Sequence, residues 1–192
     1  MKAGNILFTG VGGQGILLAS ELTALALLSA GFDAKKSEVH GMAQRGGSVT
    51  AQLRFGARVY GPLIAMGTAD VQVAFEMMEA VRYLPYLRPN ATVVVNTQKI
   101  LPPLVATGQA SYPENILQNL TERKISFLSL DAFEIARQVG ESKTANVVMV
   151  GALSALLPVK ADVFEQSIAT RVPARFKEAN IEAFRRGRAV ST

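Results

Sequence analysis

The chain has 192 residues, of which 49% are hydrophobic and 18% charged, so it fits one folded domain and excludes a disordered or fibrous protein. It contains no cysteine and one histidine, which excludes disulfides, a catalytic thiol, a cysteine-held iron–sulfur cluster and a multi-histidine metal site. The net charge is +5, but the basic residues are not accompanied by the aromatic side chains that stack on bases in nucleic-acid binders. No apolar run is long enough to cross a membrane. We expect a single cytoplasmic domain over residues 1–192, with no metal, nucleic acid or membrane bound.

A glycine loop follows the first predicted strand, which covers about residues 4–9. The loop, residues 10–15 (GVGGQG), opens directly into a helix-forming run over about 15–30. Strand, glycine turn and helix together aim backbone N–H groups at an anion. The loop also matches the G-x-G-x-x-G pattern of dinucleotide sites, but that pattern needs an acidic residue at the far end of the second strand, and Asp33 lies at its start. A nucleotide site, a phosphate or acyl-carrier contact and a structural turn all remain open.

The second informative loop spans residues 37–48 (SEVHGMAQRGGS) and follows the next predicted strand, Ala34 to Val39. It holds His40, the one histidine of the chain, and Arg45 beside two glycines. Glycine allows close approach of the backbone to another molecule, and arginine offers a rigid fork of donors. The segment is therefore either a binding loop or a tight turn with solvated polar groups. His40 itself is either a hydrogen-bonded structural residue or, with an ordinary pKa near 6.5, a proton carrier.

The next segment, residues 48–55, alternates apolar and polar residues strictly and predicts a strand. Gly56, Ala57 and Arg58 then predict a turn into a short return strand at Val59–Tyr60, and so a β-hairpin. Antiparallel pairing inside a chain with βα patterning favours a mixed sheet. The fold class that follows is α/β, a single three-layer α/β/α Rossmann-like domain with a mixed sheet that includes a β-hairpin.

The rest of the chain alternates short strands with helices. We expect strands at 71–75, 92–96 and 124–130, and a helix at 79–87 that Pro89 stops. Asp131 should cap a helix that ends near Gly140. From residue 145 onward the pattern is helical in three pieces, divided at Pro158 and Pro173, and Asn146 is a plausible cap of the first piece.

The two loops, in this order, resemble the gamma-type small subunits of 2-oxoacid:ferredoxin oxidoreductases, and among these the beta subunit of indolepyruvate:ferredoxin oxidoreductase. The resemblance continues through most of the chain, for example at residues 69–70, 75–76, 95–96, 145–152 and 180–184. The loop with the histidine and the arginine is its specific part, and the glycine loop supports it.

The resemblance implies a holoenzyme that decarboxylates an aryl pyruvate, passes electrons to ferredoxin and transfers the acyl group to coenzyme A. Thiamine diphosphate and the iron–sulfur clusters would belong to a large partner subunit. This chain would hold no cofactor tightly, but would form walls of the active site and contact coenzyme A. Alone, its uncovered apolar surface would favour a homodimer. The alternatives are a stand-alone Rossmann-like nucleotide-binding protein or dehydrogenase, and a pure assembly subunit.

The catalytic residues stay unassigned, with His40 and Arg45 as candidates; Arg45 is the better one for a substrate carboxylate or a coenzyme A phosphate. If the second strand runs parallel to the first, both loops leave the sheet on the same side and lie close together. The candidate cofactor-binding residues come from these loops and from the start of the later helix: Gly10, Gly12, Gly13, Gln14, Gly15, Gln44, Arg45, Gly46, Gly47 and Asn146.

Overall fold

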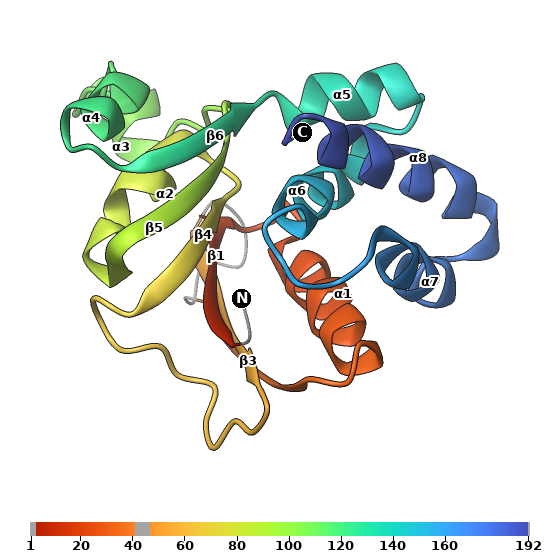
Figure 1. Ribbon diagram of the computed structural model, residues 1–192. Coiled ribbons are helices and arrows are strands. Elements are labelled where there is room, and N and C mark those ends of the chain that lie inside the picture. Colours follow the sequence, from red (N-terminus) through yellow and green to blue (C-terminus); the bar gives the residue numbers. More distant parts are fainter. Residues whose placement is uncertain (1–2, 41–46, 192) are drawn as a thin grey trace.

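The computed structural model describes residues 3–40, with the side chain of the last one excepted, and 47–191. Its centre is one six-stranded sheet in the order β2-β3-β1-β4-β5-β6. Strand β3 is antiparallel to both β1 and β2, whereas β1, β4, β5 and β6 are mutually parallel (Figure 1). The strands are β1 (Gly4–Val11), β2 (Asp33–His40), β3 (Ser48–Gly56), β4 (Ala69–Ala74), β5 (Leu87–Asn96) and β6 (Ser126–Leu130).

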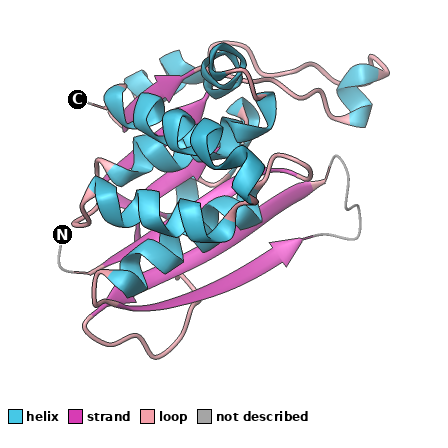
Figure 2. Cartoon of the chain, turned by 90° about the vertical axis from the view of Figure 1, so that its right-hand side faces the viewer, coloured by secondary structure: helices cyan, strands magenta, loops and turns pink. Residues whose placement is uncertain are grey.

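Helices cover both faces of the sheet, which confirms the three-layer α/β/α arrangement (Figures 1 and 2). One face carries α1 (Ile16–Ser29), α5 (Ala132–Val139), α6 (Ala145–Ser154), α7 (Ala161–Arg171) and α8 (Lys177–Ala189). The other carries α2 (Met77–Arg82) and α4 (Ile116–Glu122), with the single turn α3 (Pro103–Ala106) close by. Three-residue 3₁₀ turns lie at Leu84–Tyr86, Ser142–Thr144 and Ala174–Phe176.

The core divides between the two faces because successive strand residues point to opposite sides. In β1, Ile6 and Phe8 pack in the large cluster under α1 and α6, while Leu7 packs on the other side with Ile64. In β5, Val94 joins the large cluster, and its neighbours on either side join the cluster under α2 and α4. The central strands β3, β1, β4 and the second half of β5 are therefore buried on both faces, whereas the polar edge strand β2 is not.

Helices α6 and α8 touch backbone to backbone. A Cβ on Gly151 would lie 2.1 Å from the carbonyl oxygen of Phe184, and a Cβ on Gly187 would lie 2.0 Å from that of Val148. Glycine at both positions allows this approach. The contact fixes α6, whose first turn borders the site described below.

The predicted return strand at Val59–Tyr60 is wrong. Both edges of β3 are already paired, one with β1 and one with β2, so no edge is left for a strand that folds back. The hairpin of the fold is instead β2–β3, and residues 57–68 cross to β4 as an irregular loop. Alternation of apolar and polar residues identified the strand but not its partners.

The predicted helix at 79–87 is also wrong in its second half. Helix α2 ends at Arg82, and Pro89 lies inside β5 instead of stopping a helix. It falls where the register between β4 and β5 shifts, beside Asn90 with φ 62°. Proline has no backbone N–H, and at such an irregularity no N–H is needed for a hydrogen bond between the strands. The predicted helix capped by Asp131 and the three helical pieces after residue 145 are confirmed.

Candidate functional site

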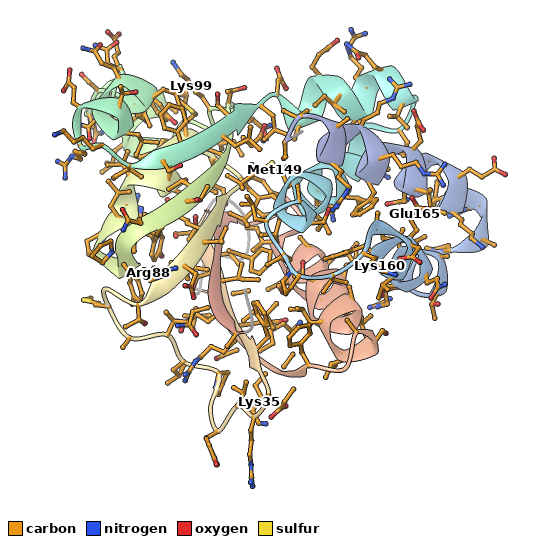
Figure 3. All side chains as sticks on the ribbon, viewed as in Figure 1. Lys35, Arg88, Lys99, Met149, Lys160 and Glu165 are labelled. Carbon is orange, nitrogen blue, oxygen red and sulfur yellow. The ribbon has the colours of Figure 1, made fainter. Side chains whose placement is uncertain are left out.

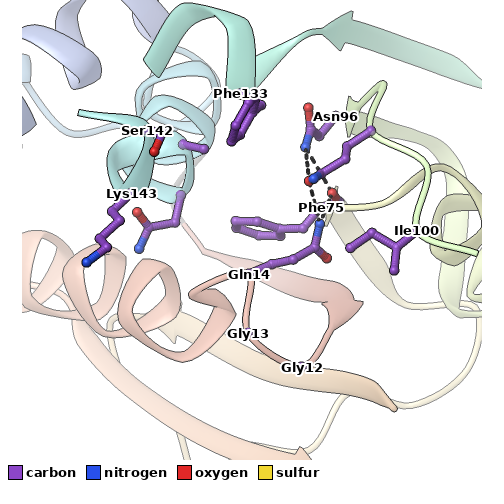
Figure 4. A pocket seen from close by; sticks show the side chains of 12 residues that line it. Gly12, Gly13, Gln14, Phe75, Asn96, Ile100, Phe133, Ser142 and Lys143 are labelled. Carbon is purple, nitrogen blue, oxygen red and sulfur yellow. Dashed lines mark hydrogen bonds between the residues drawn. The ribbon is translucent and has the colours of Figure 1, made fainter. Parts of the chain in front are cut away.

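A cavity of about 420 Å³ lies at the carboxyl ends of β1, β4 and β5 (Figure 4). The chain leaves β1 toward β2 on one side of the sheet and later continues through β4 on the other, so this is a topological switch point. Open α/β sheets bind their ligands at such points. The lining residues are Gly12, Gly13, Gln14, Phe75, Asn96, Gln98, Ile100, Phe133, Ser142, Lys143, Ala145 and Asn146.

The glycine loop forms one wall of the cavity, and at three of its positions the structure explains why the residue is glycine. A Cβ on Gly10 would lie 2.8 Å from the Cβ of Phe75, so a larger residue would push the loop away from β4. Gly13 and Gly15 have φ angles of 105° and 77°, in the region that favours glycine. Gly15 is the N-cap of α1, and no described residue accepts a hydrogen bond from the N–H groups of Gly13 or Gly15.

Gln14 braces this loop. Its Oε1 accepts a hydrogen bond from the N–H of Val11 at 2.8 Å, and its Nε2 donates to the carbonyl of Phe75 at 2.7 Å and to Oε1 of Gln98 at 3.0 Å. Both amide protons are thus used inside the protein. Gln14 borders the cavity, and its hydrogen bonds hold the glycine loop against the end of β4.

Asn146 joins the glycine loop to α6. Its Nδ2 lies 3.4 Å from the carbonyl oxygen of Gly15, and a Cβ on Gly15 would come within 2.6 Å of that same nitrogen. The cap predicted for Asn146 is wrong, because α6 begins at Ala145 with Thr144 as N-cap. Asn146 is buried in the first turn and lines the cavity.

Asn96 closes the opposite wall. Its Nδ2 donates to the carbonyl of Phe75 at 3.0 Å, and its Oδ1 accepts from the N–H of Ala132 at 3.0 Å. The side chain therefore ties the ends of β4 and β5 to the start of α5. Together with Gln14 it makes the cavity a preformed one.

The side-chain groups that the described lining leaves for a ligand are one cation, a hydroxyl and an apolar surface. Lys143 is exposed, and its Nζ has no hydrogen-bond or ion-pair partner among the described residues. Lys143 and Ser142 lie on the α6 side of the cavity, and Ile100 lies across from them (Figure 4). Phe75, Ile100 and Phe133 supply the apolar part, and Phe133 is 47% exposed.

A smaller hollow of about 150 Å³ adjoins the cavity and shares Lys143 and Asn146 with it. Leu18 of α1 and the segment before α8, with Val172 and Phe176, complete its lining. Its surface is mainly apolar. Lys143 therefore borders two neighbouring spaces, and one extended ligand could occupy both.

The glycine loop contacts the described end of the second loop at Gly47. Because β3 is antiparallel to both its neighbours, β2 runs parallel to β1 and the two loops emerge at the same end of the sheet. The N–H of Gly12 donates to the carbonyl of Gly47 at 2.9 Å. The side chain of His40, and Gln44, Arg45 and Gly46 in full, lie outside the described residues.

A buried carboxylate holds one of the segments that border the cavity. Glu76 is fully buried and caps α2, its Oε2 accepting from the N–H groups of Met78 and Glu79 at 2.7 and 3.1 Å. Its Oε1 accepts from the N–H of Ile100 and from the hydroxyl of Tyr112. Burial, followed by the bond to Glu76, raises the pKa of Tyr112 well above its usual value. Glu76 thereby fixes the segment that carries Ile100 to the cavity.

The arrangement does not support a dinucleotide site. Asp33 begins β2 at the amino end of the sheet, opposite the cavity, where its Oδ2 accepts from the N–H of Val59 at 2.7 Å. Glu38 is nearer the cavity end, but it pairs with Lys36. Neither carboxylate is placed to hold a ribose beside the glycine loop.

Two further searches concern the described part of the chain. No group of three or more histidine, cysteine, aspartate or glutamate side chains there could hold a metal ion. None of the described helices is long and apolar enough to cross a membrane.

Sequence reasoning missed Lys143, Gln98 and Phe133. Their places near the carboxyl ends of the strands follow only from the order of the strands in the sheet. Gln98 comes two residues after β5, and Phe133 is the second residue of α5, which follows β6. The available signal was the polar stretch just before the apolar helix α6, which contains Lys143 three residues ahead of Asn146.

The fold and the site define an α/β protein with a preformed, cation-bearing ligand cavity at the switch point of a mixed sheet. The family model described as pyruvate ferredoxin/flavodoxin oxidoreductase matches residues 5–190. The chain is 42% identical over 189 residues to the indolepyruvate oxidoreductase subunit IorB of Pyrococcus horikoshii, covering 96% of this chain and 94% of the relative. It is 41% identical over 192 residues to the subunit of the same name from Thermococcus kodakarensis, covering 97% and 95%.

Among solved structures, the gamma subunit of a keto/oxoacid ferredoxin oxidoreductase from Geobacter sulfurreducens is similar, with a TM-score of 0.73, 25% identity and 98% of both chains covered. The chain therefore belongs to the pyruvate ferredoxin/flavodoxin oxidoreductase family. This confirms the resemblance predicted from the two loops. It also supports an oxidoreductase subunit over a stand-alone dehydrogenase.

Proposed function

We propose that this chain is the small subunit of an indolepyruvate:ferredoxin oxidoreductase and that its cavity forms a wall of the active site, at the place where coenzyme A receives the acyl group. The curated relatives at 42% and 41% identity, which carry that substrate in their names, support the choice of 2-oxoacid. The observation that carries the site is Lys143, a cation with no partner among the described residues, beside the glycine loop and the N-terminus of α1.

The electrostatics of the cavity suit an anionic ligand. The N-terminus of a fourteen-residue helix and the unengaged N–H groups of Gly13 and Gly15 add to the charge of Lys143. Coenzyme A carries several phosphate groups on a long, flexible body, and the two adjoining hollows would accept such a shape. Phe75 and Phe133 offer the apolar surface that an aryl acyl group needs.

The reaction removes carbon dioxide from the 2-oxoacid, passes two electrons to ferredoxin and joins the acyl group to the thiol of coenzyme A. Cysteine-ligated iron–sulfur clusters do not fit this chain, which has no cysteine. They belong, with thiamine diphosphate, on a large partner subunit. When bound there, thiamine diphosphate supplies the carbanion chemistry of decarboxylation; this chain would bind, orient and shield the reactants.

The second loop should contribute to the same wall, because its Gly47 is hydrogen-bonded to the glycine loop. We assign Arg45 to a coenzyme A phosphate or the substrate carboxylate, since an arginine fork pairs with either. His40 keeps both proposed roles, structural and proton-carrying. The cytoplasmic location and the other loop residues named as cofactor contacts also stay predictions.

The test compares two lysine variants in the complex with the large subunit. Lys143→Ala should raise the KM for coenzyme A by about 10- to 100-fold, as expected for one lost bond to a charged group. Lys160→Ala removes an exposed lysine at the start of α7, away from the cavity (Figure 3), and should leave the KM unchanged. Assembly of both variants is checked by size-exclusion chromatography. If the Lys143→Ala complex has wild-type KM values for coenzyme A and indolepyruvate, the proposed site is refuted.

A further inference from the structure

The loop that joins β3 to β4 presents large apolar side chains to solvent at the end of the sheet opposite the cavity. This crossover loop, residues 57–68, exposes Tyr60 by 84%, Leu63 by 64% and Met66 by 69%. Figure 1 shows it projecting from the body of the protein, below β3. Large exposed apolar side chains that gather in one segment mark an interaction surface more often than chance exposure does.

The crossover loop is held rigidly in spite of its irregular path. Nη1 of Arg54 donates to the carbonyls of Gly61 and Leu63 at 3.1 and 3.4 Å. The N–H of Ile64 donates to Oε1 of the buried Gln52 at 2.6 Å, and Ile64 is itself buried against Leu7. These bonds come from the side chains of β3, so the strand and the loop form one unit.

Further bonds anchor both ends of the loop. The N–H of Val59 donates to Asp33 at 2.7 Å, and the N–H of Gly67 donates to the carbonyl of Pro85 at 2.9 Å. A connection whose only task is to reach β4 needs neither this fixation nor three outward apolar side chains. A surface whose backbone is already ordered loses less entropy on binding, which is what a docking element requires.

The charge around the loop indicates the character of the partner. Between residues 57 and 68 there is one cation, Arg58, and no acidic residue. The guanidinium of Arg58 lies 5.1 Å from the ring centroid of Tyr60. Lys35 also lies at this end of the molecule (Figure 3), but its charge is paired with Asp33 at 3.3 Å, so Arg58 and Arg54 carry the positive character of this surface.

A hollow of about 540 Å³ adjoins the loop and is lined by Arg54, Arg58 and Val59, among others. The carboxylate in its lining, Asp70, is already engaged by Arg88 and by the N–H of Asn5. A second copy of this chain docked patch to patch would set these cations against each other. An acidic partner would not meet that repulsion.

We propose that the crossover loop docks into an apolar groove, bordered by carboxylates, on the large subunit of the oxidoreductase, so that this chain is gripped at the end of the sheet remote from its cavity. The inference rests on the proposed function, because it takes the large subunit as the partner. It implies that assembly and ligand binding use opposite ends of the same sheet and are separable by mutation.

The experiment measures the affinity of this chain for the purified large subunit. The triple variant Tyr60→Ser, Leu63→Ser, Met66→Ser should weaken the complex by about 100-fold or more, because three central apolar anchors are lost. The matched control, Leu28→Ser with Val190→Ser, removes two apolar side chains that are 49% and 39% exposed on the helical side. It should bind like wild type. Circular dichroism and melting temperature check the fold, and Leu63→Asp alone replaces the triple variant if that one unfolds.

Each outcome decides a different point. Wild-type affinity in a folded triple variant overturns the proposal. If the triple variant instead turns a self-associated chain into a monomer and keeps its affinity for the large subunit, the occupant is a second copy and the proposal is overturned. If the wild-type chain does not bind the large subunit at all, the proposed function itself fails. Raising the salt concentration should weaken the wild-type complex more than the Arg58→Gln complex; equal salt dependence would contradict the acidic border.

Discussion

Replacing Gly15 by alanine should reveal how tightly the glycine loop is fitted against α6. Gly15 has φ 77°, and an alanine in the left-handed region costs roughly 1–2 kcal/mol. Its Cβ would also lie 2.6 Å from Nδ2 of Asn146, roughly 0.8 Å short of an ordinary contact. Relieving that overlap in a packed site should add about 1–2 kcal/mol. We expect Gly15→Ala to lower the free energy of unfolding by about 2–4 kcal/mol in total.

The control for backbone strain is Gly31→Ala. Gly31 has φ 86°, and no heavy atom lies within 4 Å of a Cβ built there, so it should lose about 1–2 kcal/mol from strain alone. Urea unfolding of the purified chain measures both variants. In an Asn146→Ala background most of the excess cost of Gly15→Ala should disappear, because Nδ2 and Cγ of Asn146 are gone and only its Cβ, at 3.1 Å, remains close. The reasoning is refuted if Gly15→Ala costs no more than Gly31→Ala, or if its excess cost survives undiminished in that background.

Two further predictions concern packing and pH. Gly187→Ala should destabilise the chain by roughly 3 kcal/mol or more, because its Cβ meets the Val148 carbonyl at 2.0 Å; Gly61→Ala, with open space around it, should stay within about 0.5 kcal/mol of wild type in the same urea titration. The pKa of Tyr112 is raised in the folded state, so its stabilising contribution is complete below about pH 10 and is lost as the pH rises toward the raised value. Unfolding free energies between about pH 9 and 11 should therefore fall more steeply for wild type than for Tyr112→Phe; parallel curves would contradict a half-buried, Glu76-bound tyrosine.

Local residue patterns predicted most of the elements. The alternation over residues 48–55 and the apolar run from Ile16 predicted β3 and α1 almost to their ends, and Asp131 marked the start of α5. The prediction of which strands pair with one another was wrong for β3. The pattern of β3 is the same whether it pairs with a following strand or, as here, with β1 and β2.

The site was predictable only where its signal lies in consecutive residues. The glycine loop, and its approach to the second loop, followed from strand, turn and helix order. Lys143 and Phe133 could not be assigned in this way, since their place in the cavity depends on β5 and β6 lying beyond β4 in the sheet. Gln14 and Asn146 line the cavity, but their hydrogen bonds to the loop are tertiary contacts that no local spacing encodes.

The measurement that tests the central claim most directly is the dependence of turnover on this chain and its partner together. The purified chain is assayed with indolepyruvate, coenzyme A, thiamine diphosphate and an artificial electron acceptor, first alone and then with the large subunit. Because the chain has no cysteine for clusters, it should be silent alone, and acyl-coenzyme A should form only when both subunits are present. Turnover by this chain without a second subunit would contradict the account, as would a large subunit whose activity is the same with and without it.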